Sequence, residues 1–325
     1  MDSIDQQVFQ QVRTWLNTGT ACWLCTVVAT FGASPRPVGS LLAYSVKGEL
    51  IGSLSGGCVE DDLLQKLLSG ALSITAPQQL EYGVTAAENE RLGLPCGGRL
   101  HILVEHWEPT PILLAQLEQL HSLLQQRRIA NRSLDLRTGV WSIAEIDHFV
   151  SLELTPISLV QCYGPRLQML LVGAGEIARS LAAMAQLLDY RVLVCDPRRD
   201  LIAQWNLDGI ELLNCMPDDA VRDYCRDDAH SIVITLTHDP RIDDMALMEA
   251  LQHNLFYVGA LGSERTSAAR KKRLRLLDLS EQQIAKLHAP VGLKIGSKRP
   301  SEIAIAILAE LTLLRSGTST IIGQQ

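Results

Sequence analysis

The chain has 325 residues, and at about 150 residues per domain this length predicts two globular domains. Apolar residues make up 47% and charged residues 20% of the sequence, a balance that can build cores and that excludes a largely disordered protein. The longest apolar stretch, near residues 21–31, is too short to span a bilayer, and a net charge of −7 argues against nucleic acid as the main partner. The first ten residues lack the basic and apolar regions of an export signal, so we expect a cytoplasmic protein.

Residues 1–160 predict a mixed α/β domain. Apolar spacing predicts a helix over 6–15, and apolar and β-branched residues predict a strand over 22–30 and a hairpin over 41–53. The segment 32–37 holds two prolines and a glycine and must be a loop. The remaining predicted elements are helices over 59–68 and 112–127, short strands at 80–83 and 100–105, and two edge strands within 132–154.

The pattern breaks at 156–166, where Pro156, Gly164 and Pro165 lie, and we place the domain boundary there. The second domain, residues 167–325, alternates strands and helices. The strands are predicted at 169–172, 191–195, 232–236 and 256–258, and the helices at 177–188 and 243–251. This alternation predicts a Rossmann-like, doubly wound parallel sheet.

The clearest motif is Gly173-Ala174-Gly175, which joins the first of these strands to its helix. Gly173 allows the tight turn, and Gly175 lets a phosphate or pyrophosphate approach the N–H groups of the helix N-terminus. Asp196 closes the next strand, where an acidic side chain would accept a hydrogen bond from a ribose hydroxyl. The combination favours a nucleotide-like ligand over the alternative, in which the glycines only permit close packing.

Further loops should meet the glycine loop, because ligands of open α/β sheets bind beyond the carboxyl ends of the strands. These loops are 235–239, 259–263 and 292–296. His238 and Asp239 are either an acid/base or hydrogen-bonding pair or a turn cap, and the sequence leaves both open. The basic stretch 270–275 predicts a helix with a solvated face, with binding of a phosphate or an acidic partner as the alternative.

Two of the eight cysteines stand apart. Cys58 follows Ser-Gly-Gly at the start of a helix, where the dipole favours a thiolate, and Cys96 is followed by two glycines. Thiolates there would suit a late metal, a sulfur-rich cofactor or a persulfide, and the alternative is that both pack as small apolar residues. Cys22 and Cys25 should point to opposite faces of a strand, which favours packing over a metal site.

Several blocks of the sequence resemble the XdhC/CoxI family, the accessory proteins of xanthine dehydrogenase and related molybdenum hydroxylases. In the first half these blocks are 32–37, 52–60 and 95–98. In the second half, blocks similar to the Rossmann domain of that family are 173–175, 196–198, 237–241, 257–263, 288–296 and 300–304. The resemblance covers nearly the whole chain with the blocks in the same order.

The resemblance implies a molybdenum cofactor-binding chaperone without turnover of its own. Such a protein holds the cofactor while its terminal sulfido ligand is installed and inserts it into an apo molybdenum hydroxylase. The implied ligand is molybdopterin or its cytosine dinucleotide form, and the dinucleotide would use Asp196. Glu176 adds a negative charge beside the phosphate site. An NAD(P)-dependent oxidoreductase is the alternative.

The resemblance also implies partners and site residues. The partners are the client hydroxylase, a cysteine desulfurase as sulfur donor, cofactor-synthesis enzymes and a second copy of the chain in a homodimer. Cys58 and Cys96 would contact the molybdenum or its sulfido ligand. The cofactor-binding residues are expected to be Arg36, Gly56, Gly57, Cys58, Cys96, Gly97, Gly98, Gly173, Gly175, Asp196, His238, Asp239 and Gly262.

Overall fold

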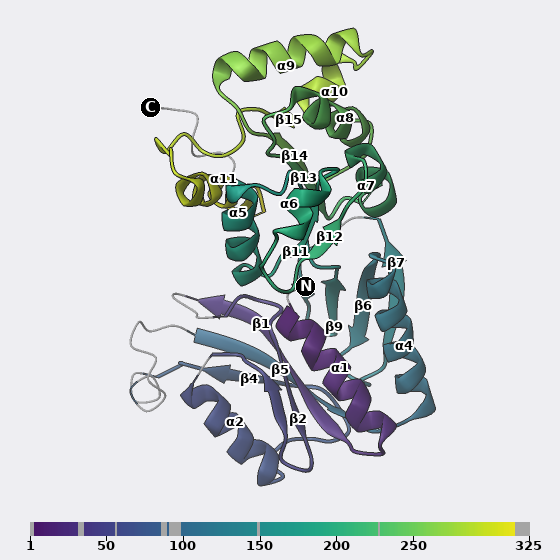
Figure 1. Cartoon of the computed structure of the whole chain (residues 1–325). Coiled ribbons are helices and arrows are strands. Elements are labelled where there is room, and N and C mark those ends of the chain that lie inside the picture. The colour runs from purple at the N-terminus through teal and green to yellow at the C-terminus, as the bar shows by residue number, and fades with distance from the viewer. Residues whose placement is uncertain are drawn as a thin grey trace. The chain divides into compact units, whose positions relative to one another are not determined.

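The chain divides into two compact units, Met1–Pro165 and Arg166–Gln325 (Figure 1). The computed structural model describes residues 3–31, 36–55, 57–85, 90, 99–147, 150–226 and 228–315, without the side chains of Ser3 and Cys58. Within these ranges no helix is long and apolar enough to cross a membrane.

The first unit contains two antiparallel sheets. The five-stranded sheet has the order β3-β2-β1-β5-β4, and the four-stranded sheet has the order β7-β6-β9-β8. The strands are β1 (Cys22–Phe31), β2 (Leu41–Ser45), β3 (Leu50–Gly52), β4 (Gln78–Tyr82), β5 (Arg99–Trp107), β6 (Ile129–Asp135), β7 (Trp141–Ile146), β8 (Glu153–Leu154) and β9 (Ser158–Tyr163). The helices are α1 (Ser3–Asn17), α2 (Cys58–Leu68) and α4 (Pro111–Gln125).

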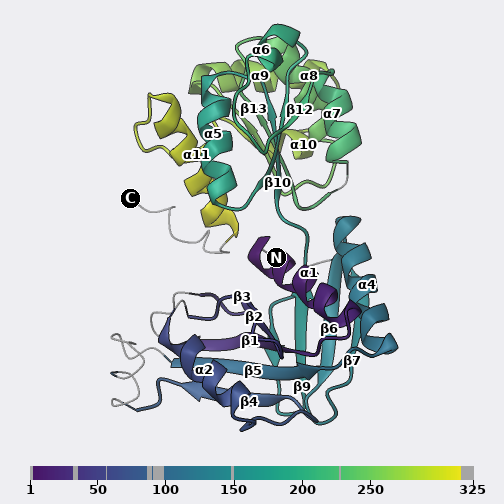
Figure 2. The same ribbon diagram turned by 60° about the horizontal axis from the view of Figure 1, so that its bottom comes forward.

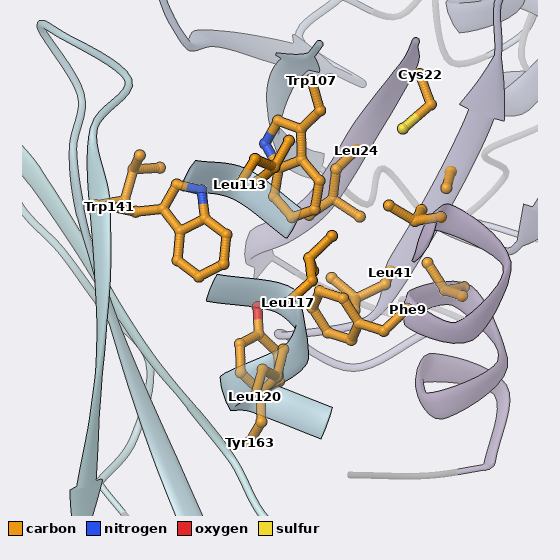
Figure 3. Close-up of a cluster of buried hydrophobic side chains, with 14 of the residues drawn as sticks. Phe9, Cys22, Leu24, Leu41, Trp107, Leu113, Leu117, Leu120, Trp141 and Tyr163 are labelled. Carbon is orange, nitrogen blue, oxygen red and sulfur yellow. The ribbon is translucent and has the colours of Figure 1, made fainter. Parts of the chain in front are cut away.

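Separate apolar clusters cover the two faces of the five-stranded sheet. On one face, Phe9 of α1, Leu117 of α4 and Trp141 of the second sheet pack with β1 and β5 (Figure 3). On the other face, α2 packs against the sheet through Leu63 and its neighbours. Cys22 belongs to the first cluster and Cys25 to the second, which confirms that their sulfurs point to opposite faces. Burial raises the pKa of the Cys22 thiol to about 12, so it is an unreactive packing residue.

The four-stranded sheet differs from the sequence prediction. The segment 156–166, where we place the boundary, contains β9, which pairs with both β6 and β8, and the division between the two units falls at the end of the segment, after Pro165. β6 is therefore an interior strand rather than an edge strand. Pro156 and Pro165 flank β9 without interrupting it, because proline is excluded only where a ladder needs its N–H group.

The second unit is a six-stranded parallel sheet of order β12-β11-β10-β13-β14-β15. This is the Rossmann order, which confirms the predicted fold class. The strands are β10 (Gln168–Val172), β11 (Arg191–Cys195), β12 (Glu211–Leu213), β13 (Ser231–Thr235), β14 (Tyr257–Ala260) and β15 (Leu287–His288). The helices are α5 (Glu176–Leu187), α6 (Arg199–Ala203), α7 (Pro217–Tyr224), α8 (Pro240–Ala250), α9 (Glu264–Leu276), α10 (Glu281–Ala285) and α11 (Pro300–Arg315).

Helices cover both faces of this sheet (Figure 2). Residues of α5 and α11 pack on one face, and residues of α7, α8, α9 and α10 pack on the other. β10, β13 and β14 are buried along their whole length, as their nearly continuous apolar sequences require. The elements α6, β12, α7, α10, β15 and α11 were not foreseen from the sequence.

A buried ion pair links the two sheets of the first unit. Arg132 of β6 and Glu105 of β5 are almost completely buried, and their side chains form a bidentate contact that includes an Nη1–Oε1 distance of 3.0 Å. The guanidinium carbon also lies 4.6 Å from the centroid of the Trp141 ring. Loss of one partner would leave a charge without compensation inside the core.

We therefore expect Glu105→Ala to lower the free energy of unfolding of the first unit by about 3 to 5 kcal/mol. Urea denaturation followed by tryptophan fluorescence measures this, because Trp107 and Trp141 flank the pair. The matched control is Glu145→Ala, which breaks the exposed Arg128–Glu145 pair and should cost less than about 1 kcal/mol. Equal losses in the two variants would contradict a stabilising role of the buried pair.

Candidate functional site

The glycine loop after β10 is tight at one glycine and open at the other. Gly173 has a φ of +110°, and a Cβ at this position would lie 2.7 Å from Cγ2 of Thr237. Gly175 is the N-cap of α5 without a side-chain cap, and a Cβ there would meet nothing within 4 Å. The loop therefore leaves the uncapped N–H groups of α5 approachable from the Gly175 side.

Asp196 holds this loop in place. Its carboxylate is 0% exposed and accepts hydrogen bonds from the backbone N–H of Ala174 at 2.9 Å and of Arg198 at 3.0 Å. The Arg198 guanidinium completes the set, with Nε–Oδ1 and Nη2–Oδ2 distances of 2.9 and 2.7 Å. Burial alone would raise the pKa of Asp196, but the hydrogen bonds from Arg198 and Ala174 outweigh it and hold that pKa below its usual value. Asp196 is thus an ionised anchor inside the loop.

The loop after β13 contains a helix cap. The Asp239 carboxylate accepts a hydrogen bond from the backbone N–H of Arg241 at 3.0 Å and caps α8. Hydrogen bonds from the Arg241 side chain and backbone lower the pKa of Asp239 to about 2. His238 is exposed, and among the described residues no hydrogen bond joins it to Asp239. Of the two alternatives left open by the sequence, the structure shows the cap.

A second buried ion pair ties two loops of this sheet edge together. Arg270 of α9 donates to Asp243 Oδ2 at 2.7 Å and to the carbonyl oxygen of Leu261 at 2.9 Å. Asp243 in turn accepts from the hydroxyl of Thr237 at 2.8 Å. Next to Leu261, Gly262 has a φ of +157° and lies close to the Thr266 side chain. The loops after β13 and β14 therefore have a common anchor.

The basic stretch 270–275 lies on a helix, as the sequence predicts, but it is a solvated face only in part, because Lys272 and Arg275 are exposed. Arg270 is buried, Arg273 is bonded to Asp244 at 2.5 Å, and Arg275 is bonded to Glu281 at 2.5 Å. The number of charges along a helix does not reveal which of its basic side chains are buried, because acidic partners distant in sequence decide this. Arg270 and Arg273 therefore serve the fold.

The loop after β15 also has a carboxylate anchor. Glu310 of α11 accepts hydrogen bonds from the Tyr257 hydroxyl, from Nδ1 of His288 and from the backbone N–H of Gly292, each at 2.7 Å. The predicted convergence of the 292–296 loop is consistent with the 3.0 Å hydrogen bond from Val291 to the last residue of β14. Glu310 was missed from the sequence because it lies in a different element from all its partners.

In the first unit, a carboxylate organises the loop that leads to Cys58. Glu60 of α2 accepts hydrogen bonds from the backbone N–H groups of Leu54, Ser55 and Gly57, at 3.0, 2.8 and 3.0 Å. The hydroxyls of Ser53 and Ser55 also donate to it. Cys58 is the first residue of α2, as the sequence predicts. The only sequence signal for Glu60 was its place in the 52–60 block.

Other predicted site residues of this unit fall partly outside the described residues. Gly56, Cys96, Gly97 and Gly98 lie outside them, as does the side chain of Cys58. Arg36 is described and partly buried. Within the described ranges, no group of three or more His, Cys, Asp or Glu residues could hold a metal ion.

An apolar groove of about 660 Å³ lies between α5 and α11. Leu187, Leu293 and Ile305 are among its lining residues, and Thr312 contributes the one hydroxyl side chain. Aliphatic walls of this kind cannot compensate the burial of a phosphate charge. The candidate binding groups of this unit therefore remain those of the sheet edge.

The two glycines of the loop should respond differently to substitution. Gly173→Ala should lower the free energy of unfolding by about 1 to 3 kcal/mol, because the added methyl meets Thr237 in a left-handed conformation. Gly175→Ala should change it by less than about 1 kcal/mol, since space is open there. Chemical denaturation of both variants measures the difference, and a reversed order would contradict the assigned roles.

Asp196 should also make the second unit acid-sensitive. A carboxyl whose pKa is lowered by folding stabilises the protein above its unfolded pKa of about 3.9, and this contribution is lost as the pH falls through the folded value. The stability difference between the wild type and Asp196→Asn should be full at pH 7 and shrink below about pH 4. Thermal melts across pH 3–7 measure it, with the exposed Asp200→Asn variant as control. A difference that does not vary with pH would contradict the anchor role.

Known proteins resemble this chain over both units. The model of the XdhC Rossmann domain matches residues 169–311, and the model of the XdhC and CoxI family matches residues 15–83. A Bacillus subtilis protein, named as a probable component of xanthine dehydrogenase, is 25% identical, with 92% of this chain and 94% of that protein covered. The molybdenum cofactor insertion chaperone PaoD of Escherichia coli is also 25% identical, with 92% and 85% covered.

One solved structure supports the fold. A Bacillus halodurans protein described as a xanthine dehydrogenase superposes with a TM-score of 0.73 at 24% identity, with 97% of each chain covered. The two matched models come from one family and fall in different units of the structure. The chain belongs to the XdhC and CoxI family.

Proposed function

We propose that this chain binds the molybdenum cofactor and delivers it to an apo molybdenum hydroxylase of the xanthine dehydrogenase type. Family membership and a relative named as a molybdenum cofactor insertion chaperone support this role. The observation that carries it to particular residues is the glycine loop, open at Gly175 and fixed by Asp196. Once delivered, the cofactor supplies the redox chemistry of the enzyme that receives it.

The phosphate end of the cofactor fits the second unit. The first N–H groups of α5 have no side-chain cap, and the helix dipole favours an anion at this end. Glu176, which adds an unfavourable charge in the first turn, is paired with Arg179 at 3.0 Å. Because Asp196 and the Asp243–Arg270 pair already hold the surrounding loops, binding would require little reordering.

The cysteines of the first unit suit a sulfur-bearing ligand. The loop held by Glu60 delivers Cys58 to the first position of α2, where the dipole favours a thiolate. We propose that Cys58 and Cys96 contact the molybdenum or its sulfido ligand while a cysteine desulfurase supplies the sulfur, in the cytoplasm. Arg36 and the neighbouring glycines complete this half of the proposal.

Cofactor retention tests the proposal. The protein is purified from a host that makes the cofactor, and the released pterin is oxidised and measured by fluorescence. Cys58→Ser and Cys96→Ser should each reduce retained pterin by about tenfold or more. Loss of residues that only orient the ligands of a metal already lowers metal affinity by about 10- to 100-fold.

Cys162→Ser is the matched control. This cysteine lies in the same unit on β9, and its Sγ donates to Asn131 Oδ1 at 3.4 Å, a bond that serine can keep. We expect it to retain the wild-type amount of pterin. Absence of pterin from the wild type, or full retention in a variant that carries both Cys58→Ser and Cys96→Ser, would contradict the proposed role.

A further inference from the structure

Resting on the proposed function, the geometry of the Asp196 anchor points to the form of the ligand. We propose that Arg198, and not Asp196, faces the ligand beside the glycine loop, and that this position reads a terminal phosphate monoester rather than a ribose diol. The site would then take the plain pterin phosphate in preference to its cytosine dinucleotide form. This reverses the role that the sequence assigns to Asp196.

Asp196 has no acceptor capacity left for a ribose. A carboxylate offers about four lone-pair positions, and Asp196 receives hydrogen bonds from Ala174 N, Arg198 N, Arg198 Nε and Arg198 Nη2. The residue is also 0% exposed. A ribose hydroxyl would have to displace one of these charge-assisted or backbone bonds, and displacing Ala174 would release the glycine loop itself.

Arg198 has the opposite properties. Its side chain is 43% exposed and follows β11 at the edge of the sheet where the glycine loop lies. Nε and one N–H of Nη2 are used by Asp196, and among the described residues the remaining guanidinium N–H groups have no hydrogen-bond partner. The paired N–H groups of a guanidinium match the geometry of two phosphate oxygens. The ion pair with Asp196 holds the guanidinium in place and leaves its remaining N–H groups for a ligand.

The two groups that would donate to the phosphate, the glycine-loop N–H and the Arg198 guanidinium, lie on either side of one carboxylate oxygen. Oδ2 of Asp196 accepts from both Ala174 N of the glycine loop and Nη2 of Arg198. The Arg198 guanidinium therefore lies next to the N–H groups of the glycine loop, which leads into the N-terminus of α5. Two further acids, Asp200 and Asp239, are within electrostatic reach of Arg198. Asp200 is exposed, and Asp239 is already held by Arg241 through Nε–Oδ1 and Nη2–Oδ2 bonds of 3.1 and 2.8 Å. A phosphate at this position would meet donors from two elements.

The test uses the full chain and titration calorimetry with four ligands. These are the plain pterin phosphate, its cytosine dinucleotide form, CDP, and 2′,3′-dideoxy-CDP as a probe without the diol. We expect the wild type to bind the plain form more tightly than the dinucleotide, and CDP and its dideoxy analogue to differ by less than about twofold. Arg198→Gln should weaken the plain form by about tenfold or more, in line with the loss of a charge-assisted bond, and Arg198→Lys should recover part of that loss.

Arg222→Gln is the matched control, because Arg222 is 44% exposed and ion-paired but lies in the last turn of α7. It should bind every ligand as the wild type does. A strong preference for CDP over its dideoxy analogue, abolished by Asp196→Asn, would assign the diol to Asp196 and overturn the inference while leaving the proposed function intact. Failure of the wild type to bind either cofactor form would overturn both.

Discussion

Buried or partly buried carboxylates that accept hydrogen bonds from loop N–H groups are the interaction on which both units depend. Asp196 fixes the glycine loop, and Glu310 fixes the loop after β15. In the first unit, Glu60 performs the same task for the loop before α2. In each case the loop N–H groups have no partner in a strand ladder or a helix. A single acidic side chain from another turn supplies the acceptor instead.

This arrangement explains why acidic residues in this protein are often structural. An ionised carboxylate forms stronger hydrogen bonds than a neutral acceptor, and several donors on one group specify a single loop conformation. The desolvation cost is high, so every buried acid must be matched, as Asp243 is by Arg270 and Glu105 by Arg132. Loops that are already held in place need little ordering when a ligand arrives.

The sequence predicted what depends on local pattern. Hydrophobic periodicity located α1, β1, α2 and the alternating elements of the Rossmann sheet, and the Gly173 motif located the loop at its edge. The prediction from sequence failed where a partner distant in sequence decides the structure. Arg270 reads as a surface charge until Asp243 is placed beside it, and β9 reads as a linker until β6 and β8 pair with it.

Asp196 shows the same limit within a recognised motif. An acidic residue at the end of the second strand predicts a ribose acceptor only if its oxygens are free, and nothing local shows that Arg198, two residues later, folds back to fill them. The pairing also changes what the site presents, since a buried anion is covered by an exposed cation. The position of a motif therefore fixes where a ligand would lie, whereas the hydrogen-bond partners of its side chains fix which chemistry the ligand meets there.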